Sequence, residues 1–149
     1  MKAIILVGVS ASGKSTRARL LCREGYVALD RDDIRFSMTK AQSWAEYNFD
    51  HKLENIINDV HKVMAEKAAA QGRDVVIAET NLNPKTRRRW ENRLENLGYD
   101  VIMVPMHITL EEAVDRDSKR EYSVGRKVIE SQWSNWIDFL HEIGQEDRL

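Results

Sequence analysis

Residues 8–16 read "GVSASGKST" and directly follow five apolar residues, "AIILV", at positions 3–7. The stretch fits the spacing G-x-x-x-x-G-K-[ST] without a mismatch. Gly8 and Gly13 permit the backbone torsions that turn successive N–H groups toward phosphate oxygens, and a helix that begins there adds the positive end of its dipole. The stretch therefore predicts a buried strand, a phosphate-binding loop and a helix, in that order.

The chemistry expected of this loop is the binding of a nucleoside triphosphate. Lys14 is expected to reach the β- and γ-phosphates, and Ser15 to ligate Mg²⁺. The residues expected to contact the nucleotide are Gly8, Ser10, Ala11, Ser12, Gly13, Lys14, Ser15 and Thr16. A glycine-rich turn formed by chance is the alternative, but the strand before the loop and the helix after it are both as the motif requires.

The rest of the chain alternates strand-like and helix-like segments. The expected strands are residues 3–7, 26–30, 74–78 and 100–106. The expected helices run from the loop to about residue 23, over 43–70, from 84 to 97, from about 110, and over 127–141. This alternation predicts an α/β fold with a parallel sheet covered by helices on both faces. Ligands of such sheets bind beyond the carboxyl ends of the strands.

Composition limits the class of protein. The 149 residues suit one domain, 1–149, and their 42% hydrophobic and 32% charged content is typical of a globular protein. The formal net charge is −1, so an affinity for nucleic acid has to come from local patches. The single cysteine, Cys22, excludes an internal disulfide, fits a reducing cytosol and is expected to fill a buried helix face. The apolar N-terminal run is too short for a membrane span.

The segment "DRDDIR", residues 30–35, places three carboxylates and two arginines after the second strand. Transfer of a phosphoryl group to an alcohol needs a carboxylate that accepts the hydroxyl proton, and Asp32 or Asp33 is suited to this. Arg35 is suited to hold a phosphate of the substrate. The alternative is that the aspartates only cap a helix N-terminus.

The segment "ETNLNP", residues 79–84, follows the third strand. Glu79 is expected to bind a metal-ligated water or an arginine of the site. Thr80 and Asn81 are equally well explained as substrate contacts or as a plain turn. The pair at 83–84 is a helix cap followed by a first-turn proline.

A third group follows the fourth strand. In "RDSKRE", residues 116–121, Arg116 and Arg120 are four positions apart and are expected on one helix face. Such a helix can act as a lid that brings arginines over the transferred phosphoryl group. Without further context, a solvated charged helix is the simpler explanation.

Other conspicuous residues have ordinary explanations. The basic run "PKTRRRW", residues 84–90, is either a nucleic-acid patch or the exposed face of a helix with Trp90 packed inward, and we favour the second. The four histidines show no metal-ligand spacing. Trp133 and Trp136 are expected to anchor the core, because they share an apolar stripe with Ile129 and Leu140.

Taken together, "GVSASGKST", "DRDDIR", "ETNLNP" and "RDSKR" resemble the bacteriophage polynucleotide 5′-kinases and the kinase half of related end-healing enzymes. The resemblance implies a P-loop kinase fold with strand order 2-3-1-4 and a helical lid. It implies transfer of the γ-phosphate of ATP or GTP, with Mg²⁺, to the 5′-hydroxyl of single-stranded or duplex-end DNA or RNA. It also implies a cytoplasmic location, which is the host cytoplasm if a phage encodes the chain, and no phosphatase domain.

The resemblance also implies roles for individual residues. Lys14 and Ser15 match the phosphate-loop lysine and the metal-binding serine. Asp32 matches the general base, and Arg35 the arginine that grips the adjoining phosphate. The lid arginines, which stabilise the transferred phosphate, match Arg120 and, as a second contact, Arg116.

This sequence departs from the family pattern at four places. Glu79 stands where an aspartate is usual, Asp30 adds a negative charge, Ser10 and Ala11 replace a proline or glycine, and Val124-Gly125 replaces a Val-Pro. A small-molecule kinase and a nucleotide-dependent nucleic-acid-binding module stay open as alternatives. The sequence leaves the preferred donor, the choice of DNA or RNA, the end structure and the oligomeric state undetermined.

Overall fold

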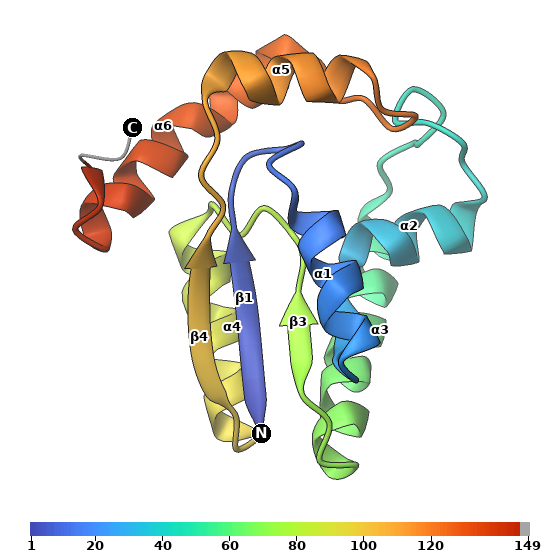
Figure 1. Cartoon of the computed structure of the whole chain (residues 1–149). Coiled ribbons are helices and arrows are strands. Elements are labelled where there is room, and N and C mark those ends of the chain that lie inside the picture. Colours follow the sequence, from blue (N-terminus) through green and yellow to red (C-terminus); the bar gives the residue numbers. More distant parts are fainter. Residues whose placement is uncertain (147–149) are drawn as a thin grey trace.

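The computed structural model describes residues 1–146 and contains a four-stranded parallel sheet with the order β2-β3-β1-β4. The predicted strand order is therefore confirmed. Figure 1 shows β3, β1 and β4 side by side. The strands are β1 (Lys2–Val7), β2 (Val27–Leu29), β3 (Val75–Ile77) and β4 (Asp100–Pro105). The two strands in the middle of the sheet, β1 and β3, are almost continuously apolar because helices cover both of their faces.

In the part of the chain that the structure describes, six α-helices surround the sheet. They are α1 (Lys14–Arg23), α2 (Arg31–Thr39), α3 (His51–Ala70), α4 (Pro84–Asn96), α5 (Leu110–Ser118) and α6 (Arg126–Glu142). Figure 1 shows α5 and α6 crossing above the carboxyl ends of the strands, where the sequence predicts the ligand site.

The alternation of side chains along β1 separates two cores. Ala3, Ile5 and Val7 face the larger core, which also contains buried side chains of α3, α4, α5 and α6. Leu6 belongs to the smaller core, where it meets Ala18 of α1. Successive residues of a strand point to opposite faces, so this single strand joins both layers of helices.

The predicted helix over 43–70 is wrong in its first part. The helix α3 begins at His51, after Asp50 accepts hydrogen bonds from the backbone N–H groups of Lys52 and Leu53 at 2.8 and 3.3 Å. Residues 41–50 form an irregular connection instead. Its apolar residues have near-helical spacing, but an aspartate N-cap fixes where a helix begins.

Packing of single residues agrees with most expectations. Trp90 and Trp136 are buried, and Trp133 packs against the larger core. The expectation for Cys22 is wrong, because its side chain is exposed on α1. In the described range 1–146, no helix combines the length and the apolar character that a membrane crossing requires.

Candidate active site

A cavity of about 720 Å³ opens at the carboxyl ends of the strands. Five segments line it: the phosphate loop with the start of α1, the first part of α2, the connection between α2 and α3 at Trp44, the end of β3, and the end of α5 with the lid loop, residues 119–125. Three of these segments follow strands directly, as the rule for open parallel sheets predicts. The sequence-predicted residues that line it are Ser10, Ala11, Gly13, Lys14, Ser15, Thr16, Asp32, Glu79, Thr80, Arg116 and Arg120.

The phosphate loop is tightly packed against Met106, which follows β4. A Cβ atom added to Gly8 would lie 2.7 Å from Ser12 Oγ and 3.0 Å from Met106 Cβ, so only glycine fits there. Gly13 has a φ of 99°, which glycine adopts without strain. Ala11 has a φ of 64°. An alanine thus adopts the left-handed conformation at a modest cost.

Lys14 lies folded against its own loop. Its Nζ donates hydrogen bonds to the carbonyl oxygens of Gly8 and Val9 at 3.0 and 2.7 Å. Burial and the positive charge of Arg120 lower the pKa of Lys14 to about 7, although Asp30 and Asp32 act in the opposite direction. An anionic phosphate at this place would restore the charged ammonium, because it supplies the compensating charge.

We expect nucleotide affinity to fall as the pH rises above 7. Lys14 loses its proton there in the free protein, and bound phosphate raises the pKa of Lys14, so binding takes up a proton. Ionisation of Asp30, whose pKa is about 7, adds repulsion in the same range. The dissociation constant of ATP should increase up to about tenfold per pH unit. Titration of the protein with ATP at pH 6.5, 7.5 and 8.5 measures this dissociation constant. The increase with pH should persist in Asp30→Asn, a variant that keeps the helix cap because asparagine also caps helices. A constant affinity would contradict this.

Serine and glutamine side chains tie the loop to α6. The backbone N–H of Ser10 donates to Gln132 Oε1 at 2.8 Å, and Gln132 Nε2 donates to Ser10 Oγ at 3.0 Å. The sequence contained no signal for this contact, because the two residues are 122 positions apart. It fixes the first turn of the loop in place.

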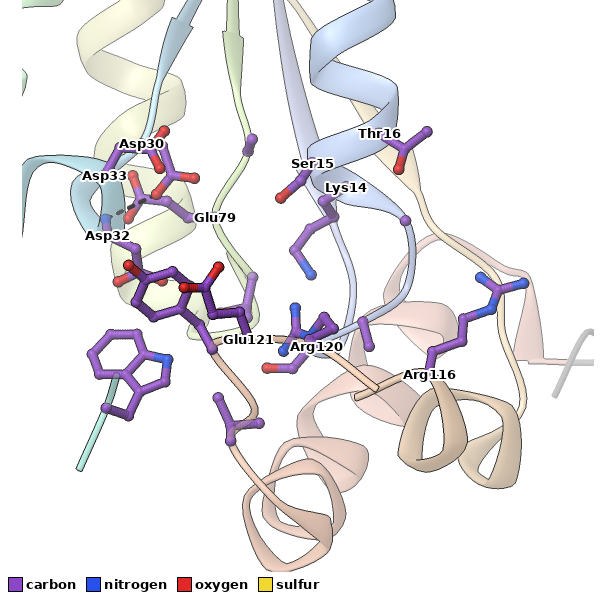
Figure 2. Close-up of a pocket in the computed structure, with 18 of the residues that line it drawn as sticks. Lys14, Ser15, Thr16, Asp30, Asp32, Asp33, Glu79, Arg116, Arg120 and Glu121 are labelled. Carbon is purple, nitrogen blue, oxygen red and sulfur yellow. Dashed lines mark hydrogen bonds between the residues drawn. The ribbon is translucent and has the colours of Figure 1, made fainter. Parts of the chain in front are cut away.

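At the start of α2, one aspartate caps the helix and two others face the cavity. Asp30 is the N-cap and accepts a hydrogen bond from the Asp32 backbone N–H at 2.8 Å. Burial, with the nearby charges of Asp33 and Asp32, raises the pKa of Asp30 to about 7. Because Asp30 does the capping, the carboxylates of Asp32 and Asp33 are left to face the cavity, as Figure 2 shows for this acidic cluster.

Arg35 is held from two sides. Its Nη1 donates to Asp32 Oδ1 at 2.7 Å, and its Nε and Nη2 donate to the two oxygens of Glu54 at 2.9 and 2.8 Å. The hydroxyl of Tyr47 donates a short hydrogen bond to Glu54. Sequence reasoning missed Glu54, since nothing in a helical sequence marks which carboxylate meets an arginine of another helix. Arg35 lines a smaller adjacent cavity of about 170 Å³, together with Asp32 and Thr80.

Glu79 is turned toward two partners, the half-buried Arg31 and the buried His61. Its Oε1 accepts a hydrogen bond from Arg31 Nε, and its Oε2 lies 3.0 Å from Nε2 of the fully buried His61. Burial alone would raise the pKa of Glu79, but His61 and Arg31 outweigh it and lower the pKa. The expected arginine partner is thus Arg31, and the extra methylene of glutamate lets the carboxylate reach α3. His61 is the second partner, which the spacing of the histidines did not indicate.

The residues after Glu79 have different surroundings. Thr80 lines both cavities. Asn81 is buried, with a φ of 53°, and its Nδ2 donates to the carbonyl oxygen of Leu6 at 2.7 Å. Asn81 therefore joins the ends of β3 and β1, and it also lines the smaller cavity. Arg87 of α4 is buried, donates to the carbonyl oxygen of Asn81 at 2.8 Å and so supports this turn.

The two lid arginines do not share a helix face. The helix α5 ends at Ser118, so Arg116 lies in its last turn and Arg120 lies beyond its C-cap. The expected i,i+4 arrangement is therefore wrong. Figure 2 shows the guanidinium of Arg120 beside Lys14, and that of Arg116 directed away from it toward the side of Thr16.

Asp117 organises the lid loop. This carboxylate is 1% exposed and accepts hydrogen bonds from Arg120 Nη2 at 2.7 Å and Ser123 Oγ at 2.8 Å. It also accepts from the backbone N–H groups of Val124 and Gly125 at 3.0 and 2.8 Å. Burial opposes ionisation, but these four donors outweigh it and lower the pKa of Asp117 to about 2. The loop that carries Arg120 is thus fixed by one side chain.

We expect Asp117→Asn to lower the free energy of unfolding by about 2 kcal/mol at pH 7. The folded pKa lies below the ordinary 3.8, so this stability is present above pH 3.8 and is lost as the pH falls toward 2. Urea unfolding of the wild-type protein and of the variant at pH 7 measures this difference, and the same measurement at pH 3 shows whether the difference becomes smaller in acid. Asp115→Asn is the control, since the Asp115–Lys119 pair is exposed and should contribute less than about 1 kcal/mol. Equal destabilisation by both variants would contradict the assignment.

Comparison with known proteins agrees with this geometry. The model of a family described as an AAA domain matches residues 4–143. A protein of Autographa californica nuclear polyhedrosis virus, described as a bifunctional polynucleotide kinase/RNA ligase, is 30% identical over 90% of this chain and 20% of its own length. The chain thus spans only about a fifth of this relative.

Solved structures share the fold. A chain in the structure of a Pnkp1/Rnl/Hen1 complex is 25% identical, with a TM-score of 0.67 over 77% of this chain and 38% of that one. A chain in the Pnkp1/Rnl/Hen1 RNA repair complex is 24% identical, with a TM-score of 0.79 over 95% and 45%. The Mycobacterium tuberculosis APS kinase CysC is 22% identical, with a TM-score of 0.60 over 79% and 69%. Because the family model spans nearly the whole chain, this protein belongs to the AAA-domain family and has the fold of a P-loop kinase.

Proposed function

We propose that this chain is a polynucleotide 5′-hydroxyl kinase that transfers the γ-phosphate of a nucleoside triphosphate to the 5′-end of RNA or DNA. The observation that carries this proposal is the position of Asp32, across one cavity from Lys14 and the phosphate loop. A carboxylate that faces a phosphate loop suits an alcohol acceptor, because an alcohol has a proton to give up.

The residues around the cavity divide the reaction between them. The phosphate loop and Lys14 hold the β- and γ-phosphates, and Arg120 adds positive charge on the same side. Asp32 accepts the proton of the acceptor hydroxyl while the hydroxyl oxygen attacks the γ-phosphorus, and the bond from this phosphorus to the β–γ bridging oxygen breaks to release the nucleoside diphosphate. Arg35, held by Glu54, is placed to bind the phosphate that follows the terminal nucleoside.

The site also fits Mg²⁺. The hydroxyl of Ser15 is a hard oxygen ligand of the kind that this ion prefers, and Ser15 lines the cavity. Within residues 1–146, no three metal-ligating side chains form a cluster, and Mg²⁺ in kinases is usually held by few protein ligands and by substrate phosphates. Mg²⁺ neutralises charge on the transferred phosphate when bound, with Ser15 as the proposed protein ligand.

The nature of the acceptor is supported by the relatives. The viral relative is described as a bifunctional polynucleotide kinase/RNA ligase, and two of the structural neighbours are chains of Pnkp1/Rnl/Hen1 complexes, one of them described as an RNA repair complex. We therefore propose a role in the repair of nucleic-acid ends, in the cytoplasm and with DNA or RNA as acceptor.

The test is transfer of labelled γ-phosphate from ATP, and separately from GTP, to a 5′-hydroxyl oligonucleotide with Mg²⁺. A 5′-phosphorylated copy is the control. Label on the hydroxyl end alone is the expected result, and the ratio between the donors gives the base preference. Label on small alcohols but on neither oligonucleotide would overturn the proposal in favour of a small-molecule kinase.

A further inference from the structure

Four aromatic side chains gather beside the acceptor half of the cavity. Phe36 lies on α2, Trp44 and Tyr47 lie in the connection between α2 and α3, and Tyr122 lies in the lid loop. The centroid of the Phe36 ring is 4.7 Å from that of Trp44 and 4.4 Å from that of Tyr122. We call these four residues the aromatic cluster. It lies outside the two hydrophobic cores of the described residues, so its rings are not needed to fill them.

The cluster is open toward the cavity. Phe36, Trp44 and Tyr122 line the same cavity as Asp32 and Lys14, and all three side chains are only half-buried. The Phe36 and Trp44 rings meet at 68°, edge against face, rather than as a closed parallel stack. Partly exposed aromatic faces in a substrate cleft are surfaces on which a further flat ring can stack.

One face of α2 carries three different chemical groups at helical spacing. Asp32, Arg35 and Phe36 occupy positions i, i+3 and i+4, which places them next to one another, with Cβ atoms about 5–6 Å apart. They supply a carboxylate, a guanidinium and an aromatic ring. A terminal nucleotide carries the matching groups in one unit. Its 5′-hydroxyl can meet the carboxylate of Asp32, its phosphate the guanidinium of Arg35, and its nucleobase the ring of Phe36.

The donor nucleotide is not the ligand that fits the cluster. Figure 2 shows Lys14 between the acidic cluster that contains Asp32 and the side of the cavity that contains Thr16 and Arg116. Phe36 belongs to the helix that carries Asp32, so the aromatic cluster lies on the acceptor side of Lys14.

We propose that the aromatic cluster is the stacking platform for the nucleobase of the acceptor's 5′-terminal nucleotide. This proposal rests on the proposed function and adds to it the part of the acceptor that the enzyme recognises. Every base has a stackable face, so the platform accepts all four bases and rejects an end that lacks a base. The terminal base must also be unpaired, since a base stacked on protein has left its duplex neighbours.

The test compares two 5′-hydroxyl oligonucleotides that differ only in their first nucleotide, one natural and one abasic. With the wild-type protein, the abasic acceptor should have a KM about ten- to a hundredfold higher. Trp44→Ala should raise the KM of the natural acceptor by a similar factor and leave the abasic one nearly unchanged, and Trp44→Phe should restore most of the difference.

Phe49→Ala is the matched control. Phe49 is an aromatic residue of the same connection, but it is 66% exposed, packs against His51 and does not line the cavity, so its loss should alter neither acceptor. Equal KM values for the two acceptors with wild-type protein would overturn the platform while leaving the kinase activity established. An equal rise in the KM of both acceptors in Trp44→Ala would also overturn the platform. Transfer to neither oligonucleotide would overturn the proposed function and the platform with it.

Discussion

Asp32→Ala is expected to lower kcat for phosphoryl transfer by about 10²- to 10⁴-fold, the usual contribution of a general base. The affinity for ATP should change little, because the phosphate loop and Lys14 are untouched. Arg35 should also stay in place, since the two oxygens of Glu54 hold it at 2.9 and 2.8 Å without Asp32. The loss would therefore report the proton acceptor and not a displaced arginine. Steady-state kinetics with saturating ATP and a 5′-hydroxyl oligonucleotide measures it.

Asp33→Ala is the matched control for this variant. Asp33 neighbours Asp32 on α2 and also lines the cavity, so the two substitutions remove the same group one position apart. We expect Asp33→Ala to keep most of the activity. A near-normal rate in Asp32→Ala together with a large loss in Asp33→Ala would assign the base to the other aspartate.

Arg120→Ala is expected to have the largest effect, a fall in kcat of about 10³- to 10⁵-fold. Its guanidinium lies beside Lys14, where negative charge develops as the phosphoryl group leaves the nucleotide (Figure 2). The fold should survive, because Asp117 keeps Ser123 and the backbone N–H groups of Val124 and Gly125 as donors. The melting temperature should therefore fall by only a few degrees, although kcat falls by several orders of magnitude.

Lys119→Ala provides the comparison for Arg120. Lys119 is the preceding residue, and its side chain is 73% exposed and pairs with Asp115 at 3.0 Å, away from the cavity. Its loss should change kcat less than about twofold, since exposed ion pairs contribute little. Comparable losses in both variants would mean that the lid contributes only general positive charge.

Much of the architecture followed from local sequence patterns. The motif at residues 8–16 requires a strand before it and a helix after it, so it located β1 and α1. Aspartates and an arginine after a strand predicted the acidic face of the cavity, and the parallel arrangement placed them near the loop. These features depend on neighbours within a few positions, and the sequence records such neighbours directly.

Residues that act across long sequence separations were decided only by the tertiary structure. Glu54 of α3 holds Arg35 across 19 positions, and His61 of the same helix lies against Glu79, which follows β3. Gln132 reaches the phosphate loop across 122 positions. Each contact depends on how two helices or a helix and a loop are oriented, and no periodicity encodes that orientation.

The end of the helix α5 shows the same difference between what a local sequence pattern predicts and what the tertiary structure decides. The spacing of Arg116 and Arg120 predicts one helix face only if the helix continues, but α5 ends at Ser118 and the loop beyond it is fixed by Asp117. The sequence by itself determined the fold family, the nucleotide loop and the identity of the acidic side chains. The tertiary structure decided which charges are paired, which are buried and which face the cavity, because burial and pairing are properties of segments brought together only by folding.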